Sequence, residues 1–221
     1  MPEFRPPDEP RRPVPIDPMG VAPSKMDPLK ITLASIVGGG VAIALGIATP
    51  KEESGRTVEA TLGEQGELQI RHKAGKQYLQ VYLDIVGVPT ACDGITTYQG
   101  KPLKAGMRFT EQQCAAMLEE ELVKHAIGVM KCTPGLALSS DPRVEKRREG
   151  PRFAAVSGAY NFGVGNYCGS TARKRFNAGD LMGGCEALTW WNKAGGRVIK
   201  GLVARRAREA KVCREGLGAV A

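Results

Sequence analysis

The sequence predicts an α+β fold that is mainly helical, with a small β-hairpin lobe, preceded by a disordered tail and one hydrophobic helix. Three observations favour this class. Apolar residues recur at helical spacing in several segments between residue 109 and the end of the chain. Short β-branched stretches separated by turn residues fill residues 78–97 and predict a small hairpin. An uncharged stretch of 19 residues, 31–49, precedes both.

Length and composition limit the possible functions. A chain of 221 residues is long enough for one domain with a real core and a tail. The net charge of +8 favours anionic partners. A nucleic-acid binder is not predicted, because no base-reading module is present. His72 and His125 are the only histidines and no CxxC pair occurs, so we expect neither a metal site nor a cofactor.

The six cysteines predict two or three disulfides if the domain reaches an oxidising compartment, without indicating their pairing. The alternative is a set of buried free thiols in a cytosolic protein. The sequence favours the disulfides because of the segment that precedes the domain.

The N-terminal fifth of the chain divides into two parts. Residues 1–30 are proline-rich and lack hydrophobic periodicity, so we expect a disordered tail. Residues 31–49 would span about 28 Å as a helix, close to the thickness of a bilayer's hydrocarbon core. Basic residues precede them, so we expect a single-pass membrane anchor with a cytoplasmic N-terminus. A buried core helix is the alternative, and the glycines at 38–40 argue against it.

The rest of the chain is predicted as a linker (50–67), a globular domain (68–216) and a short tail (217–221). Residues 109–130 form a clear helix with Thr110 as N-cap and Gln113 completing a capping box. Residues 136–152 break the periodicity and are expected to be an exposed loop. Further helices are predicted over 152–165, from about Asp180, and over 201–216. On the last of these we expect a solvated basic face made of Arg205, Arg206, Arg208 and Lys211.

Three blocks of the domain resemble the phage-type lysozymes, and the resemblance covers residues 68–216. "YLDIVGVPTACDGIT" looks like the hairpin motif of that family. "GAYNFGVGNYCGSTARKRFNAGD" is similar to its Y-N-x-G-x-G block with the following S-T and N-x-G-D turn. "WWNKAGGRVIKGLVARRAREAKVC" resembles its C-terminal block. The three blocks occur in the family's order and at matching intervals.

The resemblance implies a function. It points to an endolysin that hydrolyses the β-1,4 bond between N-acetylmuramic acid and N-acetylglucosamine of bacterial peptidoglycan, acting as a monomer in host-cell lysis. Some relatives carry an uncleaved, weakly hydrophobic anchor that can leave the bilayer, and residues 31–49 look like one. The expected location is the host inner membrane, followed by the periplasm after release.

The resemblance also assigns site residues. Glycoside hydrolysis uses two carboxyl groups, one protonated and one ionised. Asp84 would be the ionised carboxylate and Thr90 would hold water; a turn residue that caps its own hairpin is the alternative for Asp84. Tyr82, Tyr160, Asn161, Gly163 and Gly165 would bind substrate. The choice between hydrolysis and transglycosylation stays open.

The acid of the family is missing at its expected place. In the family a Glu ends the first helix just before a Gly, nine positions ahead of the Asp. Counting back from Asp84 gives Gly75, or Ala74 if the glycines are matched, and neither side chain can transfer a proton. Asp93 in its turn and Glu67 are weak substitutes. The sequence therefore leaves two hypotheses: a working muramidase with its acid elsewhere, and an impaired relative that binds wall glycan or regulates lysis.

Overall fold

The structure is a computed structural model, and it describes residues 31–84 and 87–218. The predicted tail of residues 1–30 lies outside the described residues, as do residues 219–221 of the predicted C-terminal tail. The helices are α1 (Leu33–Val37), α2 (Gly39–Glu53), α3 (Glu111–Cys132), α4 (Pro142–Phe162), α5 (Val164–Gly169), α6 (Thr171–Asn177), α7 (Leu181–Leu188) and α8 (Lys200–Arg214), with a 3-10 turn over Pro134–Leu136. The strands are β1 (Thr57–Leu62), β2 (Leu68–Ala74), β3 (Tyr82–Leu83), β4 (Pro89–Thr90), β5 (Thr97–Tyr98), β6 (Lys101–Pro102), β7 (Lys193–Ala194) and β8 (Arg197–Val198).

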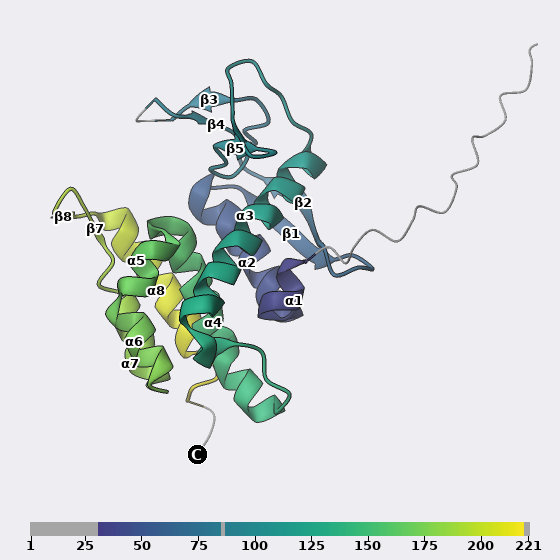
Figure 1. Ribbon diagram of the computed structural model, residues 1–221. Coiled ribbons are helices and arrows are strands. Elements are labelled where there is room, and N and C mark those ends of the chain that lie inside the picture. The colour runs from purple at the N-terminus through teal and green to yellow at the C-terminus, as the bar shows by residue number, and fades with distance from the viewer. Residues whose placement is uncertain (1–30, 85–86, 219–221) are drawn as a thin grey trace, which may run out of the picture. The chain divides into compact units, whose positions relative to one another are not determined.

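The predicted fold class is confirmed: the described chain is mainly helical, with small antiparallel hairpins. Consecutive strands pair as β1–β2, β3–β4, β5–β6 and β7–β8. The hairpins β3–β6 form a small lobe at one end of α3, and α4–α8 gather near its other end (Figure 1). The lobe has its own apolar cluster, to which α3 contributes Cys114 and Met117, while Leu118 and Leu122 of α3 join the larger helical core. Helix α3 thus connects the two cores.

Helix α3 begins as the sequence predicts. The Thr110 hydroxyl accepts from the Gln113 N–H at 3.1 Å, and the Gln113 side chain accepts from the Thr110 N–H at 2.8 Å. These two bonds satisfy N–H groups that a helix start leaves without an internal partner. The helix predicted near Asp180 is also confirmed, because the Asp180 carboxylate caps α7 by accepting from the Gly183 N–H.

The loop predicted over residues 136–152 is wrong for most of its length. Helix α4 begins at Pro142, ten residues before the predicted helix start, with Asp141 as its N-cap. Asp-Pro is a favourable start, since the carboxylate accepts from the Arg143 N–H at 2.8 Å and proline lacks an N–H that would need a partner. The charged first turns hid this helix, because they carry little apolar periodicity.

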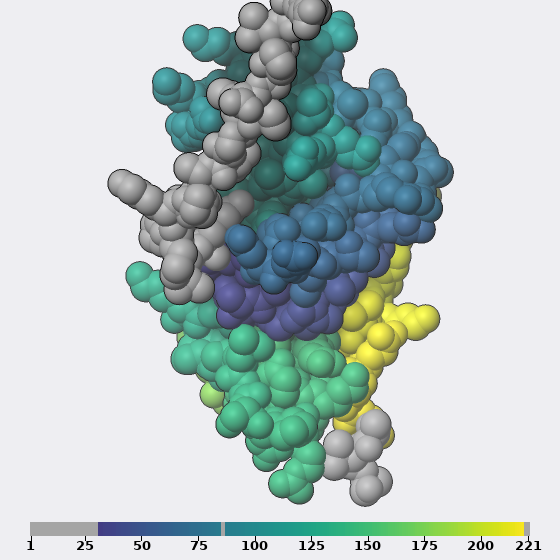
Figure 2. Space-filling model, turned by 90° about the vertical axis from the view of Figure 1, so that its right-hand side faces the viewer, coloured from purple at the N-terminus to yellow at the C-terminus, as the bar shows by residue number. Residues whose placement is uncertain are grey.

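The segment 31–49 lies in the core of the structure. Leu33, Val37, Ala42 and Leu45 are fully buried against the helical core. In Figure 2 this purple segment lies between the blue β1–β2 hairpin and the green helices. The interpretation that disfavoured a core helix is therefore wrong for the described state. No helix among the described residues is long and apolar enough to cross a bilayer.

Glycines explain how this segment packs despite their cost in a helix. The segment is two helices rather than one, because Gly38 adopts φ 86° and separates α1 from α2. Gly46 lets the β1–β2 hairpin approach, since a Cβ there would lie 2.9 Å from Leu68 Cδ2 and 3.3 Å from Ala60 Cβ. Residues 50–67, which we expected to be a linker, contain the end of α2 and all of β1.

The prediction of disulfides is confirmed, with three pairs: Cys92–Cys114, Cys132–Cys168 and Cys185–Cys213. They close loops of 22, 36 and 28 residues along the chain. Constraining the unfolded chain over such loops stabilises the fold by about 3 kcal/mol for each bond. The first pair joins the β lobe to α3, which keeps the lobe in place beside the helices.

Candidate active site

Helix α2 ends in the sequence Glu52-Glu53-Ser54-Gly55. The Ser54 N–H and hydroxyl both donate to the Pro50 carbonyl, at 3.0 and 2.9 Å, and this ends the helix. Gly55 follows with φ 73°, a left-handed conformation that favours glycine. Glu53 is therefore the last residue of its helix, two positions before a glycine, and its side chain leaves the helix near the β lobe.

The Glu53 carboxylate is held by Arg205 of α8. The Arg205 Nη1 donates to Glu53 Oε1 at 2.7 Å, and 21% of the Glu53 side chain is exposed. A Cβ on Gly94 would lie 3.5 Å from the other carboxylate oxygen, so the backbone of the lobe approaches closely there. Burial raises the pKa of Tyr160 on α4, and the charges of Glu53 and Asp93 raise that pKa further. Glu53 is thus partly enclosed by α8, α4 and the β lobe.

Its neighbour Glu52 is different. The Arg208 guanidinium contacts both Glu52 oxygens at 2.7 Å. Hydrogen bonding to Arg208 lowers the pKa of Glu52, against the opposing effect of burial. A carboxyl group with a lowered pKa is ionised at neutral pH and is unsuited to donating a proton. Glu53 is the candidate for an acid because of its position, with one carboxylate oxygen 3.5 Å from a Cβ built on Gly94 of the β lobe.

The residues predicted around the hairpin are brought together. The Asp84 carboxylate accepts from the Val88 N–H at 2.8 Å, and the Thr90 hydroxyl donates to the Val88 carbonyl at 3.0 Å. The bond to Val88 is the capping bond of a turn residue, and it also fixes the orientation of the carboxyl group. Thr90 pairs with Tyr82 across β3 and β4, and only 4% of it is exposed.

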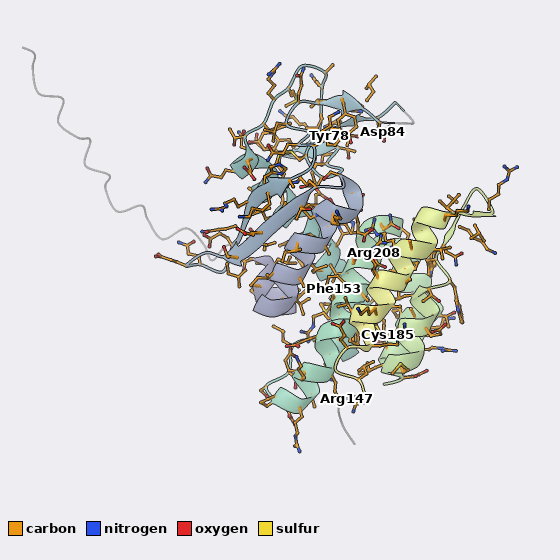
Figure 3. All side chains as sticks on the ribbon, turned by 180° about the vertical axis from the view of Figure 1, so that it is seen from behind. Tyr78, Asp84, Arg147, Phe153, Cys185 and Arg208 are labelled. Atoms are coloured by element: carbon orange, nitrogen blue, oxygen red, sulfur yellow. A yellow bond between two sulfur atoms is a disulfide. The ribbon has the colours of Figure 1, made fainter. Side chains whose placement is uncertain are left out.

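Tyr82 connects this hairpin to the end of α2. Burial raises the pKa of Tyr82, and the charges of Tyr78, Asp84, Asp93 and Glu53 raise it further. The tyrosine is therefore within electrostatic range of both Glu53 and Asp84. Figure 3 shows Asp84 in the hairpin and Arg208, the partner of Glu52, on α8 below it. The end of α2 accordingly contributes one carboxyl group to this region and the hairpin contributes another.

Asp93 is engaged in a buried ion pair with Arg56. It is fully buried, and both of its oxygens accept from the Arg56 guanidinium, at 2.8 and 2.7 Å. The Ser54 hydroxyl lies 2.8 Å from one of these oxygens. With both oxygens engaged inside the protein, Asp93 is unsuited to be the acid that we considered. It instead connects the lobe to the residues that follow Glu53.

The remaining predicted site residues lie at the end of α4 and the start of α5. The Tyr160 hydroxyl donates to the Asp93 carbonyl at 3.1 Å, and the Asn161 side-chain oxygen accepts from Arg206 at 3.2 Å. Gly163 ends α4 with φ 91°, a conformation that other residues rarely adopt. A Cβ on Gly165 would meet no atom within 4 Å, so packing does not require glycine there. The structure places Tyr160 beside Glu53, whereas Asn161 is turned toward α8.

The positions expected for the missing acid are not at the end of a helix. Ala74 is the last residue of strand β2 and pairs with Thr57 of β1. Gly75 follows with φ 94°, and a Cβ there would lie 2.9 Å from the Arg56 Cα. The β1–β2 hairpin separates the end of α2 from Tyr82, so a count of nine from Asp84 does not reach the helix. Glu67 lies directly before strand β2, in the connection between β1 and β2, and not on a helix.

Glu53 lies within residues 50–67, for which the sequence predicts a linker rather than part of a site. The signal was present as "EESG", a pair of carboxylates ahead of a helix-ending glycine. The predicted solvated face of α8 is also wrong for two of its members. Arg205 and Arg206 are 5% and 1% exposed, because carboxylates from α2 and α8 pair with them.

A cavity and the arrangement of His, Cys, Asp and Glu side chains concern the ligands that the described part of the chain could bind. A cavity of about 770 Å³ lies at the start of α4, lined by Val144, Arg147, Phe176 and Leu181 among others, and it contains none of the candidate site residues. Within the described ranges, no cluster of three or more His, Cys, Asp or Glu side chains is arranged to hold a metal ion.

The chain is similar in sequence to a family of known proteins. The sequence profile of the family described as Phage lysozyme matches residues 73–209. The chain is similar to a SAR-endolysin of Bacteriophage PS119, at 34% identity over 181 residues, 82% of this chain and 90% of that one. It is also similar to a SAR-endolysin of Enterobacteria phage PA-2, at 33% identity over 184 residues, 83% and 93% of the two chains.

The fold is also similar to those of solved structures. An endolysin from the Escherichia coli O157:H7 phage FAHEc1 superimposes with a TM-score of 0.56 at 27% identity, covering 80% of this chain and 92% of that one. A mutant of P22 lysozyme superimposes with a TM-score of 0.52, covering 76% and 93%; its identity of 23% supports the fold alone.

Proposed function

The chain belongs to the phage lysozyme family and is a peptidoglycan-degrading endolysin of host-cell lysis, and we propose that Glu53 is the general acid of its muramidase reaction. The bond attacked is the β-1,4 linkage between N-acetylmuramic acid and N-acetylglucosamine. One observation carries the assignment of the acid: Glu53 is the last residue of α2, and its carboxylate lies against Gly94 of the β lobe, 3.5 Å from a Cβ built there.

The two carboxyl groups have different tasks. Glu53 gives its proton to the leaving glycosidic oxygen, and the Arg205 guanidinium at 2.7 Å stabilises the carboxylate that remains. Asp84 stays ionised and stabilises the positive charge that develops on the sugar ring. Thr90, whose hydroxyl donates to the Val88 carbonyl while Asp84 accepts from the Val88 N–H, is proposed to help orient water. Tyr82, Tyr160, Asn161, Gly163 and Gly165 are proposed to form the surface on which the glycan lies.

This assignment favours the working enzyme over the impaired relative. The hypothesis of impairment depended on the absence of a carboxyl group at Ala74 or Gly75. Those positions belong to the β1–β2 hairpin, and a glutamate ends the helix that precedes it. The protein therefore keeps a carboxyl group where α2 meets the β lobe. The hypothesis of an impaired relative has lost its main support.

Replacing Asp84 by Ala is expected to reduce the clearing of chloroform-treated Gram-negative cells by about 100-fold or more, because the developing cation loses its counter-charge. The measurement is the initial rate of turbidity loss with purified protein. Exchanging Asp141, which caps α4 far from the hairpin, for Asn is the matched control and should preserve the rate. Clearing by the Asp84 variant at the rate of the parent would remove Asp84 from the mechanism.

We also propose that residues 31–49 anchor the protein in the host inner membrane before it acts in the periplasm. The similarity to SAR-endolysins supports this, as does the absence of charge in the segment. In the described state the same residues are buried in the core, so the segment would exchange bilayer contacts for contacts with α3 and α4. Such an exchange would complete the site, because Glu53 ends the helix built from this segment.

Substituting Lys for Gly40 tests the anchor. A charge at the middle of the segment costs about 3 kcal/mol in a bilayer, whereas in the fold Gly40 is exposed and a Cβ there meets no atom within 4 Å. We expect the parent chain to be recovered partly with carbonate-washed inner membranes and the Gly40→Lys chain to be depleted from them. Equal recovery of the two chains would contradict the anchor.

A further inference from the structure

A buried charge cluster contacts the proposed acid through Arg205. It consists of Arg205, Arg206 and Glu209 on α8, with Ser157 on α4. Glu209 and Arg206 are 3% and 1% exposed. Three donors converge on Glu209 Oε1: the Ser157 hydroxyl at 2.7 Å, Arg206 Nη2 at 2.9 Å and Arg205 Nε at 3.2 Å.

Arg205 is shared between two carboxylates. Its Nη1 donates to Glu53 at 2.7 Å, while its Nε donates to Glu209 at 3.2 Å. Its Nη2 lies 3.5 Å from the Ser157 carbonyl. Burying a guanidinium is unfavourable unless it is paired, and here one cation has two anionic partners. The charge of Arg205 is therefore divided between Glu53 and Glu209.

From this arrangement we infer that Glu209 is a positioning residue for catalysis: it holds Arg205 between two carboxylates and limits how strongly that cation stabilises the ionised form of Glu53. The inference rests on the proposed role of Glu53. A general acid must keep its proton at the working pH, and an unshared guanidinium at 2.7 Å favours loss of that proton. A second carboxylate on the same guanidinium offsets the effect.

The protonation state of Glu209 itself is set by opposing effects. Its pKa is raised overall, because burial outweighs the opposing effects of Arg206, Ser157 and Arg205. The two guanidinium donors at 2.9 and 3.2 Å from one of its oxygens favour its ionised form. Burial lowers the pKa of Arg206, and the nearby carboxylates raise it.

Other charged and titratable groups surround Glu53 and Arg205, on the elements that pack against these two residues. They are Glu52 on α2, Asp93 with Arg56 beside the lobe, Tyr82 in the hairpin, Glu121 and His125 on α3, Tyr160 on α4, and Arg206 and Arg208 on α8. Arg206 loses its ion-pair partner when Glu209 is replaced, whereas the other residues keep the contacts given above in every protein compared.

The test is the pH profile of cell clearing by the full chain with Glu209→Gln. Glutamine keeps an oxygen that can accept from Ser157 and removes the charge. The alkaline limb of the profile is expected to move to lower pH by roughly one unit, because Arg205 then acts on Glu53 alone. Clearing on that limb falls about tenfold, while the rate on the acidic side stays within about twofold of the parent. A limb that coincides with that of the parent would overturn the inference.

Controls separate this effect from a loss of structure. Glu186→Gln removes a carboxylate that contacts α8 at Arg214, and its profile should match the parent. Glu209→Asp retains the charge but withdraws it from Arg205. The alkaline limb of its pH profile should therefore lie between those of the parent and Glu209→Gln. If the Gln variant does not fold, the Asp variant decides, and an unmoved limb there contradicts the proposal. A merely structural role would lower the melting temperature and the rate at all pH values.

The inference and the proposed function fail in different ways. If Glu53 is not the acid, a Glu53→Gln chain remains active, whatever Glu209 does. If Glu53 is the acid but Glu209 does not control Arg205, the Glu53→Gln chain is inactive and the profile of Glu209→Gln is unshifted.

Discussion

A Glu53→Gln chain is expected to fold normally and to clear cells about 10²- to 10⁴-fold more slowly than the parent, which is the usual contribution of a general acid. Glutamine has nearly the same shape and can still accept a hydrogen bond from Arg205, but it has no proton to transfer. The measurement is the initial rate of turbidity loss at several pH values, with the melting temperature recorded beside it.

The matched control is the adjacent residue. Glu52 carries the same side chain one position earlier and pairs with Arg208 instead of Arg205. Glu52→Gln should keep most of the activity, because the lowered pKa of Glu52 makes it a poor proton donor. If Glu52→Gln were inactive and Glu53→Gln active, Glu52 rather than Glu53 would be the acid. If both variants were active, the acid would be another residue.

An Asp93→Asn chain is expected to lose about 3–5 kcal/mol of folding free energy, because the change removes the charge that compensates the buried Arg56 guanidinium. The side chains are 4% and 0% exposed, so water cannot replace the lost partner. For a chain of this length the loss corresponds to a melting temperature lower by roughly 10 °C or more. Thermal unfolding followed by circular dichroism measures it.

An exposed ion pair serves as the control for this prediction. Glu59 pairs with Lys73 across β1 and β2 at 2.8 Å, on the surface. Exchanging Glu59 for Gln should change the melting temperature little, since exposed pairs are screened by solvent. A melting temperature of the Asp93 variant equal to that of the Glu59 variant would show that the buried pair does not stabilise the fold.

The elements with strong local signals could be predicted from the sequence. The capping box at Thr110 and Gln113 fixes the start of α3, and Asp180 fixes the start of α7. The β3–β4 hairpin with Asp84 and Thr90 carries its own turn residues. These features depend on neighbours within a few positions, which is the range over which sequence patterns are informative.

The features that were missed depend on distant contacts. Burial of Leu33 and Leu45 requires α3, α4 and the β1–β2 hairpin to cover them, and a weakly hydrophobic stretch reads equally well as an anchor. Arg205 and Arg206 look like solvated charges until Glu53 and Glu209 are folded against them. The proposed acid lies outside the interval of nine residues before Asp84, because the β1–β2 hairpin stands between α2 and β3 along the chain.

The central claim, that the acid is present at Glu53 rather than absent from Ala74 or Gly75, is tested most directly by counting new reducing ends released from purified peptidoglycan. Three chains are compared: the parent, Glu53→Gln and Ala74→Glu. The account predicts that the parent releases reducing ends on muramic acid, that Glu53→Gln releases almost none, and that Ala74→Glu gains nothing over the parent. An inert parent that becomes active with Ala74→Glu, or a Glu53→Gln chain as active as the parent, would contradict it.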